Sequence, residues 1–142
     1  MFIFRNLACV AAILVASVDT VLTQASAPDV QGSVEVRSFD NLSGQAEDNW
    51  IGAGIANALA TEFALAQGPP RWSVRGAYQR VGDQIRITAD LSVFDSGTVE
   101  RSIRVDGALA DLFSLQDQLT AEVVTAIRDF ELRVLSGEPT GL

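Results

Sequence analysis

Beyond residue 27 the sequence contains no cysteine, no histidine and no lysine, and Cys9 is the one cysteine of the whole chain. These absences exclude a disulfide framework. They also exclude catalysis by a thiolate, an imidazole or an amine, and they remove the nitrogen and sulfur ligands that zinc usually takes. Hydroxyls, carboxylates and arginines are the side chains left for chemistry, so we expect no cofactor and no metal.

Long apolar runs are also scarce. Residues 7–18 form an apolar stretch of twelve residues, whereas a bilayer span takes about 20. The stretch follows residues 1–5, which carry one positive charge, and it precedes small side chains at Ala25 and Ala27. Charge, apolar core and small-residue exit in this order predict a secretory signal peptide over residues 1–27, cleaved after Ala27.

Two alternatives to cleavage stay open. Proline directly after a cut site is unfavourable, and Pro28 holds that position. An uncleaved membrane anchor is therefore the first alternative, and a buried cytosolic helix is the second. Cleavage or anchoring each place residues 28–142 outside the cytoplasm, either in the periplasm or attached to the inner membrane. A membrane is a partner only if the segment is uncleaved.

Basic residues are also few: the sequence has 10 of them against 18 acidic ones, and its net charge is −8. Such a chain repels phosphate backbones, which argues against nucleic acid as a partner. The distribution is uneven, because six arginines lie within residues 71–104. They mark either an arginine-based docking face or a solvated face on which opposite charges pair.

The pattern of apolar residues predicts an α+β domain over residues 28–142. Strands show a period of two and helices a period near 3.6. The expected elements are strand 33–39, helix 48–66, strands 72–80, 84–94 and 99–106, and helix 112–135. The apolar stripe of the last helix is expected to run from Leu112 to Val134. The order β-α-β-β-β-α favours a two-layer sandwich, in which a mixed sheet carries two helices on one face. We expect the connection between the first two strands to be parallel and right-handed.

The turns predict the register of the three later strands. A two-residue loop at Gly82 and Asp83 pairs Tyr78 with Ile87. Arg75 then falls opposite Asp90, and the three-residue loop of the next turn sets Arg86 opposite Asp106. A three-residue loop with Gly97 in the left-handed region pairs Val93 with Val99 and Ala89 with Ile103. Pairs of opposite charge across strands favour the self-paired face.

Several segments resemble one family. Residues 36–44 read Val-Arg-Ser-Phe-Asp-Asn-Leu-Ser-Gly, and residues 50–55 read Trp-Ile-Gly-Ala-Gly-Ile. With residues 74–76, 82–91 and 113–119, they resemble the TolB N-terminal-like domain, also called the FlgO-like domain. The resemblance implies an extracytoplasmic accessory module, found alone in the envelope or attached to TPR repeats or adenylate cyclase-type proteins. It brings no catalytic residue.

The chain departs from that family in one respect. Between the first helix and the strand at residue 72, the family usually has a further strand and helix, which are absent here. The chain therefore resembles a short variant. An expected sheet of four strands has two edges, formed by residues 33–39 and 99–106. Arg101 points to the apolar side by parity, and an inward-pointing charge blunts an edge.

The opposite edge is the candidate partner-binding site, with Val34, Glu35, Val36 and Arg37. Main-chain groups of such an edge accept a strand from an envelope protein or from a second copy. Glu35→Pro is the expected probe if the N–H of Glu35 points outward. The alternative is that residues 29–32 cover this edge.

Other candidate sites carry less weight. Residues 41–44 form either an anion cradle at a helix N-terminus or a turn with a cap, and neighbouring acids favour the turn. Trp50, Trp72 and Tyr78 are expected in the core. Asp106, Asp111 and Asp117 are numerous enough for an acid/base pair, yet acids are favourable near a helix start in any case. Three functions stay open: a non-catalytic binding module, a membrane-anchored sensory input domain, and a carboxylate-based hydrolase. The first is expected, so the chain is not expected to be an enzyme.

Overall fold

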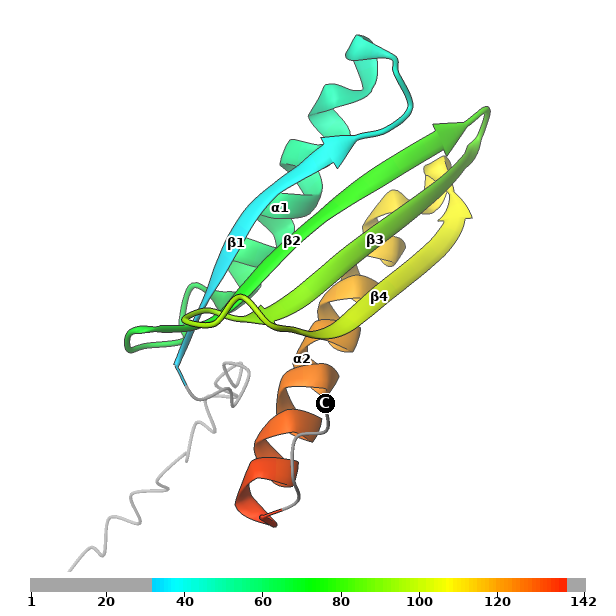
Figure 1. Ribbon diagram of the computed structural model, residues 1–142. Helices are drawn as coiled ribbons and strands as arrows, with labels where there is room; N and C mark the ends of the chain where they lie inside the picture. Colours follow the sequence, from blue (N-terminus) through cyan, green and yellow to red (C-terminus); the bar gives the residue numbers. More distant parts are fainter. Residues whose placement is uncertain (1–31, 138–142) are drawn as a thin grey trace, which may run out of the picture.

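The computed structural model describes residues 32–137, which form a four-stranded sheet with two helices on one face (Figure 1). The elements are β1 (Ser33–Asn41), the short 3-10 helix η1 (Ala46–Asp48), α1 (Asn49–Phe63), β2 (Pro70–Val81), β3 (Gln84–Val93), β4 (Val99–Ala108), the short 3-10 helix η2 (Leu109–Asp111) and α2 (Leu112–Leu135). The predicted element order and α+β sandwich are confirmed. The predicted signal peptide and residues 29–31 of the predicted cover for β1 lie outside the described residues.

The sheet is mixed, as predicted. Its strand order is β1-β2-β3-β4, with β1 parallel to β2 and the other neighbours antiparallel. In Figure 1, α1 lies behind β1 and β2, and α2 lies behind β3 and β4. Both helices therefore pack on the same face. The other face carries the polar side chains that alternate with the core residues along each strand.

One row of α1 supplies its share of the core. Ile51, Ile55, Leu59 and Phe63 recur every fourth residue and are at most 3% exposed. Burying an aliphatic or aromatic side chain of this size contributes about 1.5–3 kcal/mol. The helix ends at Phe63, three residues before the predicted end, because no later residue continues this row into the core. Leu65 is already 65% exposed.

The bounds of α2 agree with the prediction, but its buried stripe is shorter than predicted. Buried positions run from Leu112 to Ile127. Phe130 is half-buried and meets Trp72 edge-to-face, with ring centroids 4.9 Å apart. Val134 is 50% exposed, so its assignment to the stripe is wrong. The reason is geometric, because the end of α2 extends past the sheet (Figure 1).

The predicted hairpin between β2 and β3 is confirmed. Tyr78 lies opposite Ile87, and Arg75 lies opposite Asp90. Gly82 has a φ of 59°, in the left-handed region that the two-residue loop requires.

The predicted register between β3 and β4 is correct at one end and wrong at the other. Ala89 lies opposite Ile103 as predicted, but Val99 lies opposite Ser92 rather than Val93. The connection is longer than predicted, because the Val93 N–H donates to the Thr98 carbonyl at 2.9 Å. The longer connection is accommodated by a register shift between Leu91 and Ser92 in the pairing of β3 with β4.

Candidate functional site

The structure places β1 and β4 at the two edges of the sheet, as predicted. On β4, Arg101 lies opposite Leu91 and shares the helix-facing side. Its guanidinium reaches the carboxylate of Asp129 on α2 at 3.4 Å. The predicted inward direction of Arg101 is confirmed, and α2 provides its partner.

The main chain of β1 alternates between its neighbour and the open edge. The Ser33 N–H donates to the Pro69 carbonyl at 3.2 Å and so faces β2. Along a strand, successive residues direct their N–H and C=O groups to opposite sides. The register shifts between Ser33 and Val34, but the extra residue, Arg71, belongs to β2, so the alternation along β1 is unbroken. The N–H of Glu35 therefore also faces β2, whereas those of Val34 and Val36 face outward. Glu35→Pro would break pairing within the sheet, so it is the wrong probe of this edge.

The side chains of the four candidate residues divide between the two faces of the sheet. Val34 and Val36 lie opposite buried residues of β2 and are packed against the core. Glu35 and Arg37 form an ion pair at 3.3 Å, and their side chains are 41% and 60% exposed. An exposed pair of this kind contributes little to stability.

A β-bulge that sequence analysis missed limits the regular edge. Arg37 and Ser38 together stand opposite a single residue of β2, because the register shifts between Val36 and Phe39. The shift returns Phe39 to the core, where it is 5% exposed against Gly76. The signal was present in the sequence, since Phe39 breaks the parity of Val34 and Val36. A bulge also increases local twist, so strand addition is confined to the segment before it.

Hydrogen bonds of polar side chains hold the loop after β1 in place and attach it to β2. The Asn41 side chain donates to the Gln45 carbonyl at 2.7 Å, and its Oδ1 accepts from the Ser43 N–H at 2.9 Å. Ser43 Oγ in turn accepts from the Arg80 N–H on β2 at 2.7 Å. The turn interpretation of residues 41–44 is supported, because these polar groups are used within the fold.

Asp48 occupies the N-cap position of α1 but makes no side-chain cap hydrogen bond. Its carboxylate is instead buried and accepts from Arg80 Nη1 at 2.6 Å. The Tyr78 hydroxyl donates to the Asp48 carbonyl at 2.6 Å. Burial raises the pKa of Tyr78, and the nearby Asp48 charge raises it further. These contacts join the start of α1 to β2.

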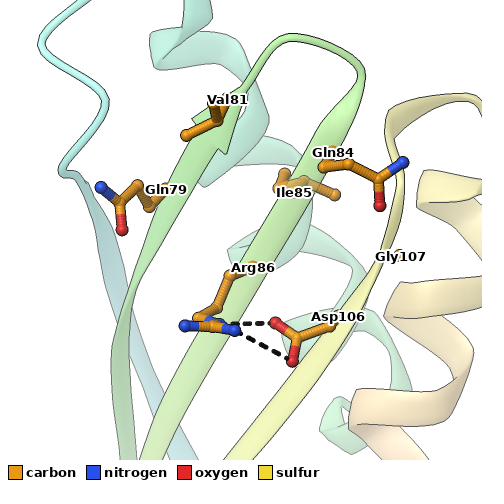
Figure 2. Close-up of a pocket in the computed structure, with 7 residues that line it drawn as sticks. All are labelled: Gln79, Val81, Gln84, Ile85, Arg86, Asp106 and Gly107. Carbon is orange, nitrogen blue, oxygen red and sulfur yellow. Dashed lines mark hydrogen bonds and ion pairs between the residues drawn. The ribbon is translucent and has the colours of Figure 1, made fainter.

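The open face of the sheet pairs its own charges. Arg86 and Asp106 form a double hydrogen bond at 2.6 and 3.4 Å (Figure 2). The hydrogen bond from Arg86 lowers the pKa of the Asp106 carboxyl. Asp90 accepts from the Ser102 hydroxyl at 2.5 Å. Arg75 lies opposite Asp90 but forms no ion pair with it among residues 32–137. The self-paired interpretation of the arginine-rich segment is therefore supported at Arg86 and not at Arg75.

A shallow depression on this face is lined by polar side chains from three strands. Figure 2 shows Gln79, Gln84, Arg86 and Asp106 around it. The two charged groups bind one another rather than point to a common centre. Among residues 32–137, no cluster of three or more carboxylates is arranged to hold a metal ion.

Of the three aromatic residues expected in the core, two are buried and one is exposed. Trp72 and Tyr78 are each 1% exposed, which confirms them as core residues. Trp50 is 58% exposed, so its assignment to the core is wrong. It neighbours the buried row of α1, but the row is already complete with Ile51 and Ile55, and Trp50 lies on the flank that faces α2.

The fold defines a small α+β domain in which no strand of residues 32–137 pairs with the outer side of β1. No family model matches the sequence. The chain is 25% identical over 132 residues to the curated protein named "Putative adenylate cyclase 3" from Rhizobium meliloti. That match covers 75% of this chain and 22% of the relative, so the chain spans about a fifth of that longer protein.

Two solved structures are similar in shape. Protein XCC0632 from Xanthomonas campestris, a DUF330 protein, has a TM-score of 0.55 and 11% identity over 76% of this chain and 92% of its own. The PelC dodecamer from Paraburkholderia phytofirmans has a TM-score of 0.46 and 19% identity, over 68% of this chain and 87% of its own. The first likeness shows a shared fold. The resemblance to the TolB N-terminal-like domain stays a prediction.

Proposed function

We propose that this domain is an extracytoplasmic, non-catalytic module that binds a protein of the cell envelope, or a second copy of itself, along β1. The observation that carries the proposal is the outward row of main-chain groups at Val34 and Val36. Within residues 32–137, no strand pairs with this row. Main-chain hydrogen bonds to an added strand would supply the affinity.

The guards of the β1 edge support this proposal. Edge strands are usually protected by charged side chains on the edge, by proline or by a covering element. The charges of Glu35 and Arg37 neutralise one another at 3.3 Å on the open face. The other edge strand, β4, has an inward arginine that is held by α2. The two edges therefore differ in protection, and β1 is the more accessible one.

The state of the carboxylates supports a function without catalysis. A general acid needs a raised pKa, whereas the Asp106 carboxyl has a lowered one because Arg86 bonds to it. The Asp48 carboxylate is engaged by Arg80 inside the fold. Asp111 and Asp117 lie exposed at and after the start of α2. A carboxylate-based hydrolase is therefore the least favoured of the three functions.

Location outside the cytoplasm rests on the signal-peptide pattern of residues 1–27. Among the helices within residues 32–137, none has both the length and the apolar character needed to cross a membrane.

Photo-crosslinking in the native cell tests the edge. A benzophenone amino acid replaces Glu35, and matched controls carry it at Arg104 on β4 and at Ser96 in the β3–β4 turn. We expect a defined adduct, with a partner or with a second copy, from position 35 and none from the two controls. Equal adducts from all three positions, or none from position 35, would overturn the proposed edge.

A proline substitution gives a second test. Val34→Pro removes an outward N–H while its ring keeps part of the apolar contact, and proline is tolerated at such edge positions. We expect loss of the adduct or of self-association, with thermal stability little changed. Glu35→Pro is the control, because it removes an N–H that faces β2 and should lower thermal stability. Unchanged association of a folded Val34→Pro variant excludes this edge.

A membrane-anchored input domain is the second candidate function. The observation in its favour is the similarity to about a fifth of a longer protein that is named as an adenylate cyclase. N-terminal sequencing of the protein from membranes separates the two candidates. A new terminus near Pro28 supports the released module, and an intact Met1 in the membrane fraction supports the anchored input domain.

A further inference from the structure

A groove runs between the first three turns of α1 and the start of α2, in the helix layer rather than on the open face of the sheet. Its walls come from α1, η2 and α2. The residues that line it are Trp50, Gly54, Asn57, Ala58, Leu109, Ala110, Leu112, Phe113 and Gln116. We infer that this groove binds a basic peptide segment that carries a large apolar side chain. The inference is independent of the β1 edge.

Two aromatic side chains border the groove without serving the core. Trp50 is 58% exposed and Phe113 is 81% exposed, whereas their neighbours Ile51 and Leu112 are 0% and 7% exposed. The core is therefore complete without them. Adjacent exposed aromatic side chains are typical of interaction sites, because they provide a large contact area with little loss of side-chain entropy.

A buried amide lies in the wall of the groove. Gln116 is 8% exposed, and its side chain makes no hydrogen bond within residues 32–137. Its Nε2 lies beside Gly54 on α1, where a Cβ would make ordinary van der Waals contact with it at 3.6 Å. A side-chain amide carries two donors and an acceptor, and so can bond both the C=O and the N–H of a peptide. Gln116 is therefore placed to bind the main chain of the occupant.

The charge around the groove selects a basic occupant. No basic residue lies between Arg37 and Arg71, a span that includes all of α1, and none between Arg104 and Arg128. The exposed acids nearest the groove in sequence are Glu47, Asp111 and Asp117. These three form no ion pair within the described part of the chain.

The same charge argues against a lipid surface. Membranes with anionic lipids attract basic protein segments and repel acidic ones. Acids this close in sequence to the lining residues favour arginine or lysine side chains on either side of an apolar anchor. The apolar anchor would lie between Trp50 and Phe113, and the main chain would pass Gln116.

Tryptophan fluorescence measures occupancy directly. The described residues contain Trp50, which is exposed, and Trp72, which is 1% exposed. The probe is an acetylated and amidated decapeptide with one leucine and one phenylalanine among arginines and alanines. Binding should shift the emission to shorter wavelength and protect Trp50 from acrylamide, while the signal of Trp72 stays constant. A control peptide carries glutamate in place of each arginine.

Three variants separate a binding role from a structural one. Phe113→Ser and Gln116→Leu should each weaken peptide binding at least about tenfold, as expected when a central contact of an interface is lost. Leu132→Ser is the matched control, because Leu132 is an exposed apolar residue of α2 outside the groove, 65% exposed. It should bind like the wild type.

Stability provides the second readout. The Gln116 side chain makes no hydrogen bond within residues 32–137, so leucine at this position breaks none and adds apolar contact. Gln116→Leu should therefore unfold at the same or a higher temperature. Better stability with weaker binding supports the inference. The inference is overturned if the arginine peptide gives no saturable shift or if the glutamate peptide binds equally. It is also overturned if Phe113→Ser and Gln116→Leu both bind like the wild type.

Discussion

Removal of the Arg80 guanidinium should strongly destabilise the domain. Arg80 Nη1 lies 2.6 Å from Asp48 Oδ1, and the Asp48 side chain is 3% exposed. Its other oxygen, Oδ2, is buried and has no hydrogen-bond partner within residues 32–137. In Arg80→Ala, the carboxylate would stay buried without its charge partner, since the turn of residues 41–44 and α1 hold Asp48 in place.

The expected cost follows from that burial. Breaking a buried ion pair by removing one partner typically costs about 3–5 kcal/mol, because an uncompensated charge remains. Domains of this size have a total stability of about 5–15 kcal/mol, so the loss would be a large fraction of it. Urea denaturation at neutral pH measures the free energy of unfolding. Asp48→Asn combined with Arg80→Ala should recover part of the loss, because the buried charge is then gone.

The fold contains a matched control for this prediction. Arg86 and Asp106 also approach to 2.6 Å, but their side chains are 55% and 47% exposed. Arg86→Ala should leave the free energy of unfolding nearly unchanged, since exposed pairs are screened by water. If Arg80→Ala and Arg86→Ala had equal effects, the reasoning from burial would be refuted.

Three further predictions concern the core, the alkaline limit and the edge. Leu119, 0% exposed, lies at the centre of the α2 stripe, and Leu119→Ala should lower the free energy of unfolding by about 2–5 kcal/mol in urea; a change near zero would contradict its place in the core. Tyr78 is the one tyrosine of a chain without lysine, and its pKa is raised above 10.0 by burial. The unfolded chain therefore loses this proton first, so stability should fall as pH rises past about 10, by at most about 1.4 kcal/mol per pH unit; Tyr78→Phe should lack that fall. In the free domain, the amide protons of Val34 and Val36 should exchange with deuterium much faster than that of Glu35, and equal rates would contradict the assigned main-chain directions.

Much of the fold could be predicted because alternation along a strand is a local property. The pairing of Tyr78 with Ile87 followed from one glycine turn and two apolar rows, and it is confirmed. The shift at Val99 could not be predicted in the same way, because the length of the β3–β4 connection depends on hydrogen bonds within the turn. The end of the α2 stripe depends on where the sheet stops, which is a property of the assembled layers.

The candidate site was predictable only in part. Strand order made β1 an edge, and that assignment is confirmed. The direction of each main-chain group was not predictable, because it depends on which residue first bonds to β2, and Ser33 decides this. The exposure of Trp50 could not be predicted either, since a tryptophan beside a buried row can face the core or the neighbouring helix. Only the position of α2 distinguishes these two cases.

The parallel pairing of β1 with β2 has a consequence for the order of folding. Short turns join β2, β3 and β4, so the contacts among these strands are between residues close in sequence. The contact of β1 with β2, by contrast, spans the whole of α1. Contacts between distant residues form late, because closing the intervening loop costs entropy first. β1 should therefore be the last strand to join the sheet and the first to leave it. A domain whose β1 has detached exposes the edge of β2, and the β1 of another molecule fits that edge by its own sequence. Exchange of this strand between two copies is thus the intrinsic route by which the domain can dimerise without any new interface.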